Sequence, residues 1–104
     1  MKTQKAQELS LEVWRYLAEH PEIKFKSMLP DRLLRKVRGC VFYCPLCELF
    51  NTPAGCNGCP LKACNKKNTL FYKWNNSRTE KTRKKYAQKI VDTIEAWKPE
   101  AQKQ

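Results

Sequence analysis

The sequence predicts a mainly α-helical, small single domain in which N- and C-terminal helices pack around a central metal-binding cysteine loop. Three observations predict this fold. The chain has 104 residues, which suits one domain and is too short for two separate cores. Apolar residues recur at helical spacing toward both ends, and all six cysteines lie between Cys40 and Cys64. We expect helices within residues 6–38, a cysteine loop over 40–64 and a basic amphipathic helix over 77–98.

The N-terminal part is expected to form two helices. The first covers residues 6–19, where apolar side chains recur every three or four positions. It should end at His20, because a residue that precedes proline is disfavoured in a helix. The second should run from Pro30 to Arg38, before Gly39. The side chains expected to face inward are Leu9, Val13, Trp14 and Leu17 in the first helix and Leu33, Leu34 and Val37 in the second.

A longer helix is expected near the C-terminus. Ser77 and Glu80 have the spacing of a capping box, in which each side chain bonds to the other residue's backbone amide. Apolar residues then recur at helical spacing until Lys98 and Pro99 break the pattern. The predicted core joins this helix to the first one through Trp14, Leu17, Ile90, Ile94 and Trp97.

The cysteine spacing predicts a structural metal site. The chain carries Cys44-x2-Cys47 and Cys56-x2-Cys59, and two residues between thiolates let one turn aim both sulfurs at the same ion. The N-terminus lacks the apolar run of a secretory signal, so we expect a reducing cytosol, where thiols bind metal in preference to forming disulfides. Four thiolates fill a tetrahedral zinc site and leave no position for catalytic water.

Five cysteines compete for the four ligand positions: Cys44, Cys47, Cys56, Cys59 and Cys64. Cys44 and Cys47 form the first pair, while Cys56, Cys59 and Cys64 are alternatives for the remaining two places. Cys40 is expected to lie outside the site as a small buried residue. Zinc is the expected metal, and an iron–sulfur cluster is the alternative because it also takes four thiolates.

The run CPLCELFNTPAGCNGCPLKACNKKNTLFYKW resembles a group of small cysteine-rich proteins encoded by bacteriophages and prophages. In that group a Cys-x-x-Cys pair, a Cys-x-x-Cys-Pro pair and a later cysteine precede an aromatic stretch. The segments SLEVWRYLAEHPEI and IEAWKP are similar to such proteins as well. The resemblance implies a phage or prophage origin, expression in the cytoplasm of a bacterial host cell, and five recurring cysteines. It implies no particular activity.

The positive charge is concentrated after the cysteines. Of the formal net charge of +11, residues 1–39 contribute +4, residues 40–61 contribute −1 and residues 62–104 contribute +8. Such a surplus is typical of nucleic-acid binding and also fits an acidic protein partner. The candidate nucleic-acid-binding residues are Lys66, Lys67, Lys73, Trp74, Arg78, Lys81, Arg83, Lys84, Lys85 and Lys89.

Two modes of nucleic-acid binding fit this pattern. Phe71, Tyr72 and Trp74 would stack on unpaired bases of a single strand while lysines neutralise phosphates. Alternatively, the basic residues of the last helix would lie against a duplex backbone. The aromatic residues have a simpler interpretation too, because rings that follow a metal site commonly cover its small core.

The sequence offers no catalytic machinery that we can assign. His20 is the only histidine, and its place before Pro21 suits a helix terminus better than a general base. No membrane span and no small-molecule substrate are expected. The sequence therefore predicts a non-catalytic, phage-type zinc-binding accessory protein that binds nucleic acid, DNA or RNA, through its basic C-terminal half. The alternative is an interaction module that binds or inhibits an acidic host or phage protein.

Overall fold

The computed structural model describes residues 3–39, 45 and 69–98. It contains helices α1 (Thr3–Glu19), α2 (Asp31–Val37), α4 (Leu70–Asn75) and α5 (Glu80–Ala96), with a 3-10 turn η1 (Lys26–Met28) before α2. Those ranges contain no strand, which confirms the predicted mainly helical fold. None of the helices described combines the length and apolar content that crossing a membrane requires. The predicted cysteine loop over 40–64 lies outside the described residues, except for the buried Pro45.

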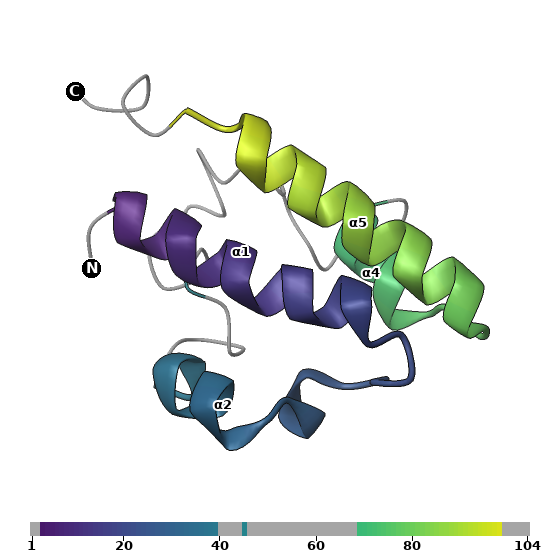
Figure 1. Cartoon of the computed structure of the whole chain (residues 1–104). Coiled ribbons are helices and arrows are strands. Elements are labelled where there is room, and N and C mark those ends of the chain that lie inside the picture. Colours follow the sequence, from purple (N-terminus) through teal and green to yellow (C-terminus); the bar gives the residue numbers. More distant parts are fainter. Residues whose placement is uncertain (1–2, 40–44, 46–68, 99–104) are drawn as a thin grey trace, which may run out of the picture.

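The two long helices form an antiparallel pair. Figure 1 shows α1 and α5 side by side and running in opposite directions. Near the start of α1, Gln7 Nε2 donates hydrogen bonds of 2.9 Å to the backbone oxygens of Ile94 and Trp97, at the end of α5. The predicted core is confirmed, because each of its members is at most 9% exposed: Trp14, Leu17, Ile90, Ile94 and Trp97.

The first helix ends where the sequence predicts. Helix α1 stops at Glu19, and the amide of His20 donates the last bond, of 2.9 Å, to the Tyr16 oxygen. The His20 ring stacks on Tyr16 at 4.1 Å, and its Nδ1 lies 3.1 Å from Glu22 Oε2. The backbone amide of Glu22 and this imidazole hold the pKa of the Glu22 carboxyl below its usual value. His20 therefore belongs to a small exposed cluster at a helix terminus.

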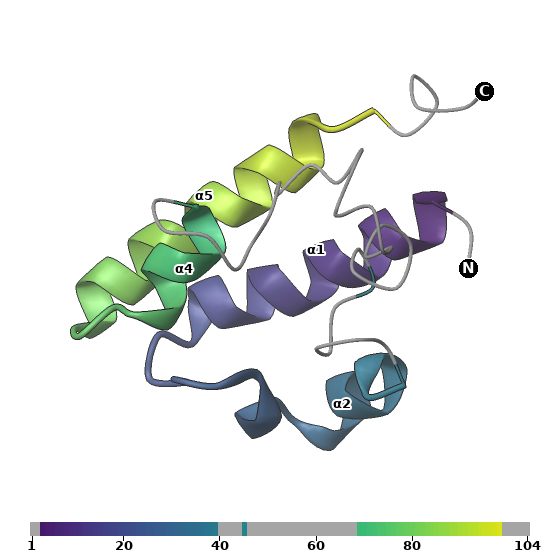
Figure 2. The same ribbon diagram turned by 180° about the vertical axis from the view of Figure 1, so that it is seen from behind.

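Helix α2 is shorter than predicted by one residue at each end. Pro30 precedes it in an extended conformation, with φ −64° and ψ 154°, and the helix begins at Asp31. Leu33 and Val37 are buried as expected, whereas Leu34 is only partly buried. Lys36 Nζ donates to Glu12 Oε2 of α1 at 2.9 Å. Figure 2 shows α2 below α1, on the side away from α5.

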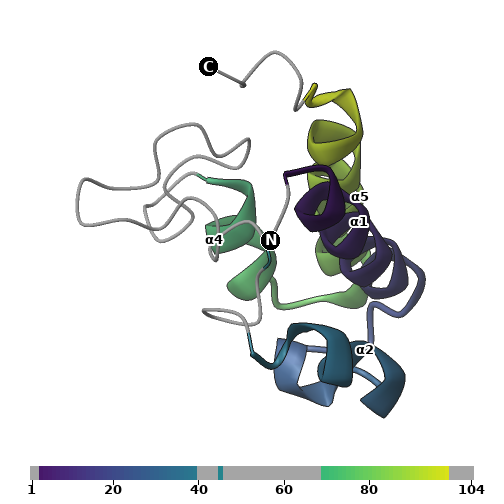
Figure 3. The same cartoon turned by 90° about the vertical axis from the view of Figure 1, so that its left-hand side faces the viewer.

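The aromatic stretch forms a short helix that we did not predict. Helix α4 covers Leu70–Asn75, and Thr69 caps it by accepting a hydrogen bond of 3.3 Å from the Tyr72 amide. Trp74 meets Trp14 of α1 edge to face, with ring centroids 5.0 Å apart. This aromatic contact attaches α4 to the α1–α5 pair, beside which α4 lies in Figure 3.

The predicted capping box at Ser77 and Glu80 is wrong. Helix α5 begins at Glu80, and its cap is Thr79, whose Oγ1 accepts a hydrogen bond of 3.1 Å from the Thr82 amide. Ser77 serves the preceding helix, because its Oγ donates to the Lys73 oxygen at 2.7 Å. Helix α5 ends at Ala96, two residues before the predicted end, where Trp97 adopts φ −71° and ψ 135°. Because α4 ends only a few residues before α5 begins, the Ser77 hydroxyl bonds to α4 and does not cap α5.

One polar group on the buried face of α1 generates a stability prediction. Ser10 is 1% exposed, and its Oγ has no hydrogen-bond partner in the described part of the chain. Burying an unpaired hydroxyl is unfavourable, and alanine is the better helix former, so Ser10→Ala is expected to raise the free energy of unfolding by about 1 kcal/mol. Urea denaturation followed by circular dichroism measures this change.

The matched control is Ser77→Ala, which removes the same hydroxyl where it makes a hydrogen bond. That variant is expected to lose about 1 kcal/mol of stability. An equal loss in Ser10→Ala would show that the Ser10 hydroxyl is paired.

Candidate nucleic-acid interface

The structure places the candidate nucleic-acid-binding residues in three groups. Lys66 and Lys67 lie outside the described residues. Trp74 and Arg83 are buried. The remaining residues reach the surface, Lys73 as a partly exposed side chain and the others as exposed ones: Arg78, Lys81, Lys84, Lys85 and Lys89.

Four exposed lysines share one side of α5, and we call them the lysine row: Lys81, Lys84, Lys85 and Lys89. Residues three and four positions apart on a helix lie on the same face. At 1.5 Å per residue, the row from Lys81 to Lys89 extends over about 12 Å. The opposite side of α5 is buried and includes Ala87 and Ile90. Packing of this apolar side therefore fixes the direction in which the lysines point.

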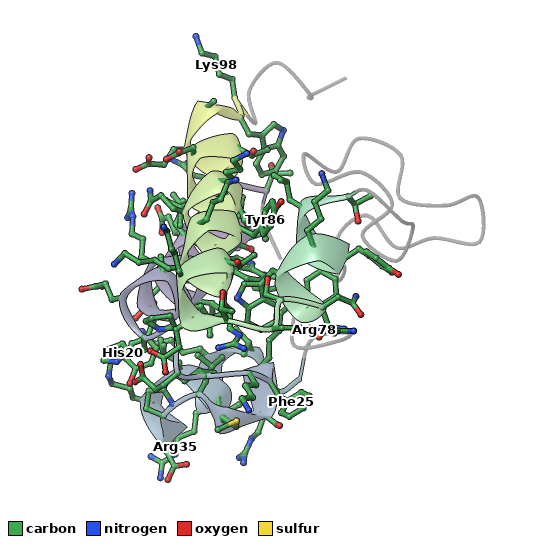
Figure 4. The ribbon with its side chains drawn as sticks, turned by 90° about the vertical axis from the view of Figure 1, so that its right-hand side faces the viewer. His20, Phe25, Arg35, Arg78, Tyr86 and Lys98 are labelled. Atoms are coloured by element: carbon green, nitrogen blue, oxygen red, sulfur yellow. The ribbon has the colours of Figure 1, made fainter. Side chains whose placement is uncertain are left out.

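Three ammonium groups surround one aromatic ring at the boundary between α4 and α5. The Nζ atoms of Lys73, Lys85 and Lys89 lie 5.7, 5.6 and 5.6 Å from the Tyr86 ring centroid. We call these four residues the Tyr86 cluster, and Figure 4 shows Tyr86 on the flank of α5 that faces α4. The electron-rich ring attracts cations, so it offsets part of the repulsion among the three charges. Because Lys73 comes from α4, the docking of α4 completes the cluster.

The carboxylates with an ion-pair partner in the described residues lie away from the lysine row and the Tyr86 cluster. Among the described residues, ion pairs join Arg15 to Glu95 and both Arg32 and Lys36 to Glu12, and the His20 ring lies beside Glu22. None of these pairs includes a residue of the lysine row or the Tyr86 cluster. Between positions 73 and 89 the only acidic residue is Glu80. The face built by α4 and the first half of α5 therefore has an uncompensated positive charge.

Arg83 is a correction to the sequence prediction. Its side chain is 4% exposed, Nη1 donates to the Pro21 oxygen, and Nη2 donates to the Ser77 oxygen at 3.2 Å. The guanidinium therefore ties the start of α5 to two loops and is not available to a phosphate. Helical spacing contained the signal, because Arg83 precedes Ala87 and Ile90 by four and seven positions and so belongs to the apolar face.

Trp74 is the second correction. It is 2% exposed and contacts both Trp14 and Phe71, and the Phe71 ring stacks on it at 6.0 Å with an interplanar angle of 30°. Lys26 Nζ from η1 lies 4.9 Å from the Phe71 centroid. The Trp74 ring therefore belongs to the core between α1 and α4 and offers no face to a nucleic acid.

The predicted metal site falls on a part of the chain that the structure does not describe. Cys44, Cys47, Cys56, Cys59, Cys64 and Cys40 all lie outside the described residues. Within the described ranges, no three histidine, cysteine, aspartate or glutamate side chains come together as a metal site would require. The zinc site and its iron–sulfur alternative therefore stay predictions from the cysteine spacing.

Comparison with known proteins adds no further assignment. No known family, curated protein or solved structure matches the chain. The resemblance to small cysteine-rich phage proteins stays a prediction from motifs, and the function has to be inferred from the side chains and their arrangement.

The two kinds of basic residue on α5 are expected to differ sharply in their effect on stability. Arg83→Met removes the charged donor of two hydrogen bonds and leaves the Pro21 and Ser77 carbonyl oxygens without this donor. We therefore expect the free energy of unfolding to fall by about 2 kcal/mol. Lys84→Met changes the exposed side chain at the next position, and the free energy of unfolding of this variant should stay within about 0.5 kcal/mol of that of the parent protein. Thermal and urea denaturation measure both variants. Equal stability of the two variants would contradict the structural role of Arg83.

Proposed function

We propose that this chain is a non-catalytic accessory protein that binds nucleic acid through the lysine row and the Tyr86 cluster. The observation that carries the proposal is the uncompensated charge of this face, whose lysines form no ion pair with the described carboxylates. Lysines that neutralise phosphates release the counterions condensed on a nucleic acid, and this release drives binding. A surface without internal carboxylate partners loses no ion pair when phosphates approach.

The rigidity of the face supports the same function. The lysine row stands on a helix whose other side is buried through Ala87, Ile90 and Ile94. Lys73 stands on α4, which Trp74 attaches to the core. Charges held on packed helices lose less conformational freedom on binding than charges on a loop. The affinity for phosphates should therefore depend on this fold as well as on net charge.

The cysteine segment has a structural part in this proposal. A zinc ion held by Cys44 and Cys47 with two of Cys56, Cys59 and Cys64 would fold the connection between α2 and α4, since metal binding and folding are coupled in such modules. Lys66 and Lys67 follow Cys64 closely and precede α4 at Leu70. The metal would thereby place these two lysines beside the face already described. An iron–sulfur cluster would supply the same four-thiolate connection.

Charge reversal on the face tests the proposal. The double variant Lys85→Glu with Lys89→Glu should weaken binding to nucleic acid on the order of a hundredfold near 100 mM salt, because two attractive contacts become repulsive. Fluorescence anisotropy with labelled DNA and RNA measures the affinity. The control is Arg35→Glu with Arg38→Glu, an equal charge change in α2 and at its C-cap. Figure 4 places Arg35 at the opposite end of the molecule from Lys98 and well away from Tyr86.

Equal losses in the two double variants would mean that only net charge matters, and would contradict a defined interface. The alternative function, binding of an acidic protein, gives a different result. Under that alternative the parent protein would capture a partner from a lysate treated with nuclease, and would show no salt-dependent affinity for purified nucleic acid.

Metal content tests the role of the cysteine segment. Elemental analysis of protein purified without added metal is expected to give about one zinc per chain, and Cys47→Ser should lose it. The matched control Cys40→Ser should retain zinc, because Cys40 is expected to lie outside the site. Iron with acid-labile sulfide would identify the iron–sulfur alternative, whereas absence of both metals would contradict the predicted site.

A further inference from the structure

We infer that the lysine row and the Tyr86 cluster bind the paired phosphate backbone of a double-stranded nucleic acid in preference to a single strand, an inference that rests on the proposed function. The sequence left both modes open. The structure separates them by showing which aromatic faces are occupied and how the cations are arranged.

A protein that binds single strands without sequence preference needs successive aromatic rings with open faces, because stacking on the bases repays the ordering of a flexible strand. Three of the rings that α4 and α5 contribute are engaged within the fold. Trp74 is buried, and Phe71 is stacked on it and approached by Lys26. Tyr86 is surrounded by the ammonium groups of its cluster. None of these three rings is free to receive a base.

Tyr72 is the remaining aromatic side chain of α4. It is partly buried, and its amide bonds to the Thr69 cap. One ring would stack on one base, whereas strand binding needs a platform for several. Tyr72 thus serves as the residue that discriminates the two modes in an experiment.

The cations, in contrast, suit a stiff target of high charge density. The lysine row is straight and about 12 Å long. Duplex DNA carries one phosphate per about 1.7 Å of its axis, or about seven over that length, which is twice the density of one of its strands. A duplex is stiff over about 50 nm, so lying along α5 costs it no ordering. A single strand would have to be ordered on the helix without the stacking that repays the cost.

The test compares a 20-base-pair duplex with each of its separated strands, as DNA and as RNA, by fluorescence anisotropy between 50 and 200 mM salt. We expect the duplex of at least one nucleic acid to bind about tenfold or more tighter than its strands at equal salt. The four lysines of the lysine row and Lys73 make five phosphate contacts, which predict a slope of about −4.5 for log affinity of the duplex against log salt. Lys85→Gln should reduce the magnitude of this slope by about 0.9. Tyr72→Leu should leave all affinities unchanged.

The outcomes separate this inference from the proposed function. Single strands that bind as tightly as the duplex, or a loss of strand binding in Tyr72→Leu while circular dichroism is unchanged, would overturn the duplex preference and leave the proposed function standing. If none of these duplexes and strands shows salt-dependent binding, both the inference and the proposed function are overturned.

Discussion

The packing of the apolar side of α5 against α1 is the interaction on which the rest of the structure depends. It buries Ala87, Ile90 and Ile94, and it consequently turns the lysine row toward solvent. At one end of the pair, Gln7 of α1 donates to backbone oxygens at the end of α5, and at the other end Arg83 of α5 donates to the Pro21 oxygen just after α1. These bonds fix how far one helix is shifted along the other. Trp14 extends the same core to α4 through its edge contact with Trp74. The basic face is therefore a consequence of how the core is arranged.

Much of this arrangement could be predicted from the sequence because helical periodicity is a direct record of burial. Trp14, Leu17, Ile90, Ile94 and Trp97 recur at helical spacing, and all are buried together. The end of α1 before Pro21 was predictable for a similar local reason, since proline restricts the residue before it. Both predictions need only the residues of one helix and the geometry of its turns.

The remaining features depend on contacts between distant segments. Helix α4 is too short for a periodic pattern, and its stability comes from Trp74 packing on Trp14, sixty positions away. Since no periodic pattern marks α4, the sequence alone places Ser77 at the start of α5, whereas its hydroxyl bonds to α4. Residue type misled the assignment of Arg83, since a guanidinium is usually exposed. Its burial is possible because the Pro21 and Ser77 oxygens, both outside α5, accept its hydrogen bonds.

The distribution of carboxylates matters as much as that of lysines. On α1, Glu12 faces Arg32 and Lys36 of α2, while Glu95 at the other end of α5 faces Arg15. These carboxylates are thereby directed to the cations of α1 and α2. The only acidic residue in the first half of α5 is Glu80, in the first turn, where the helix dipole stabilises a negative charge. The formal net charge of +11 would give a weak diffuse field if it were spread evenly. Because Glu12 and Glu95 are paired with cations of α1 and α2, they do not neutralise the lysines of α4 and the start of α5, and the positive field of that face is stronger than an even spread of charge would give.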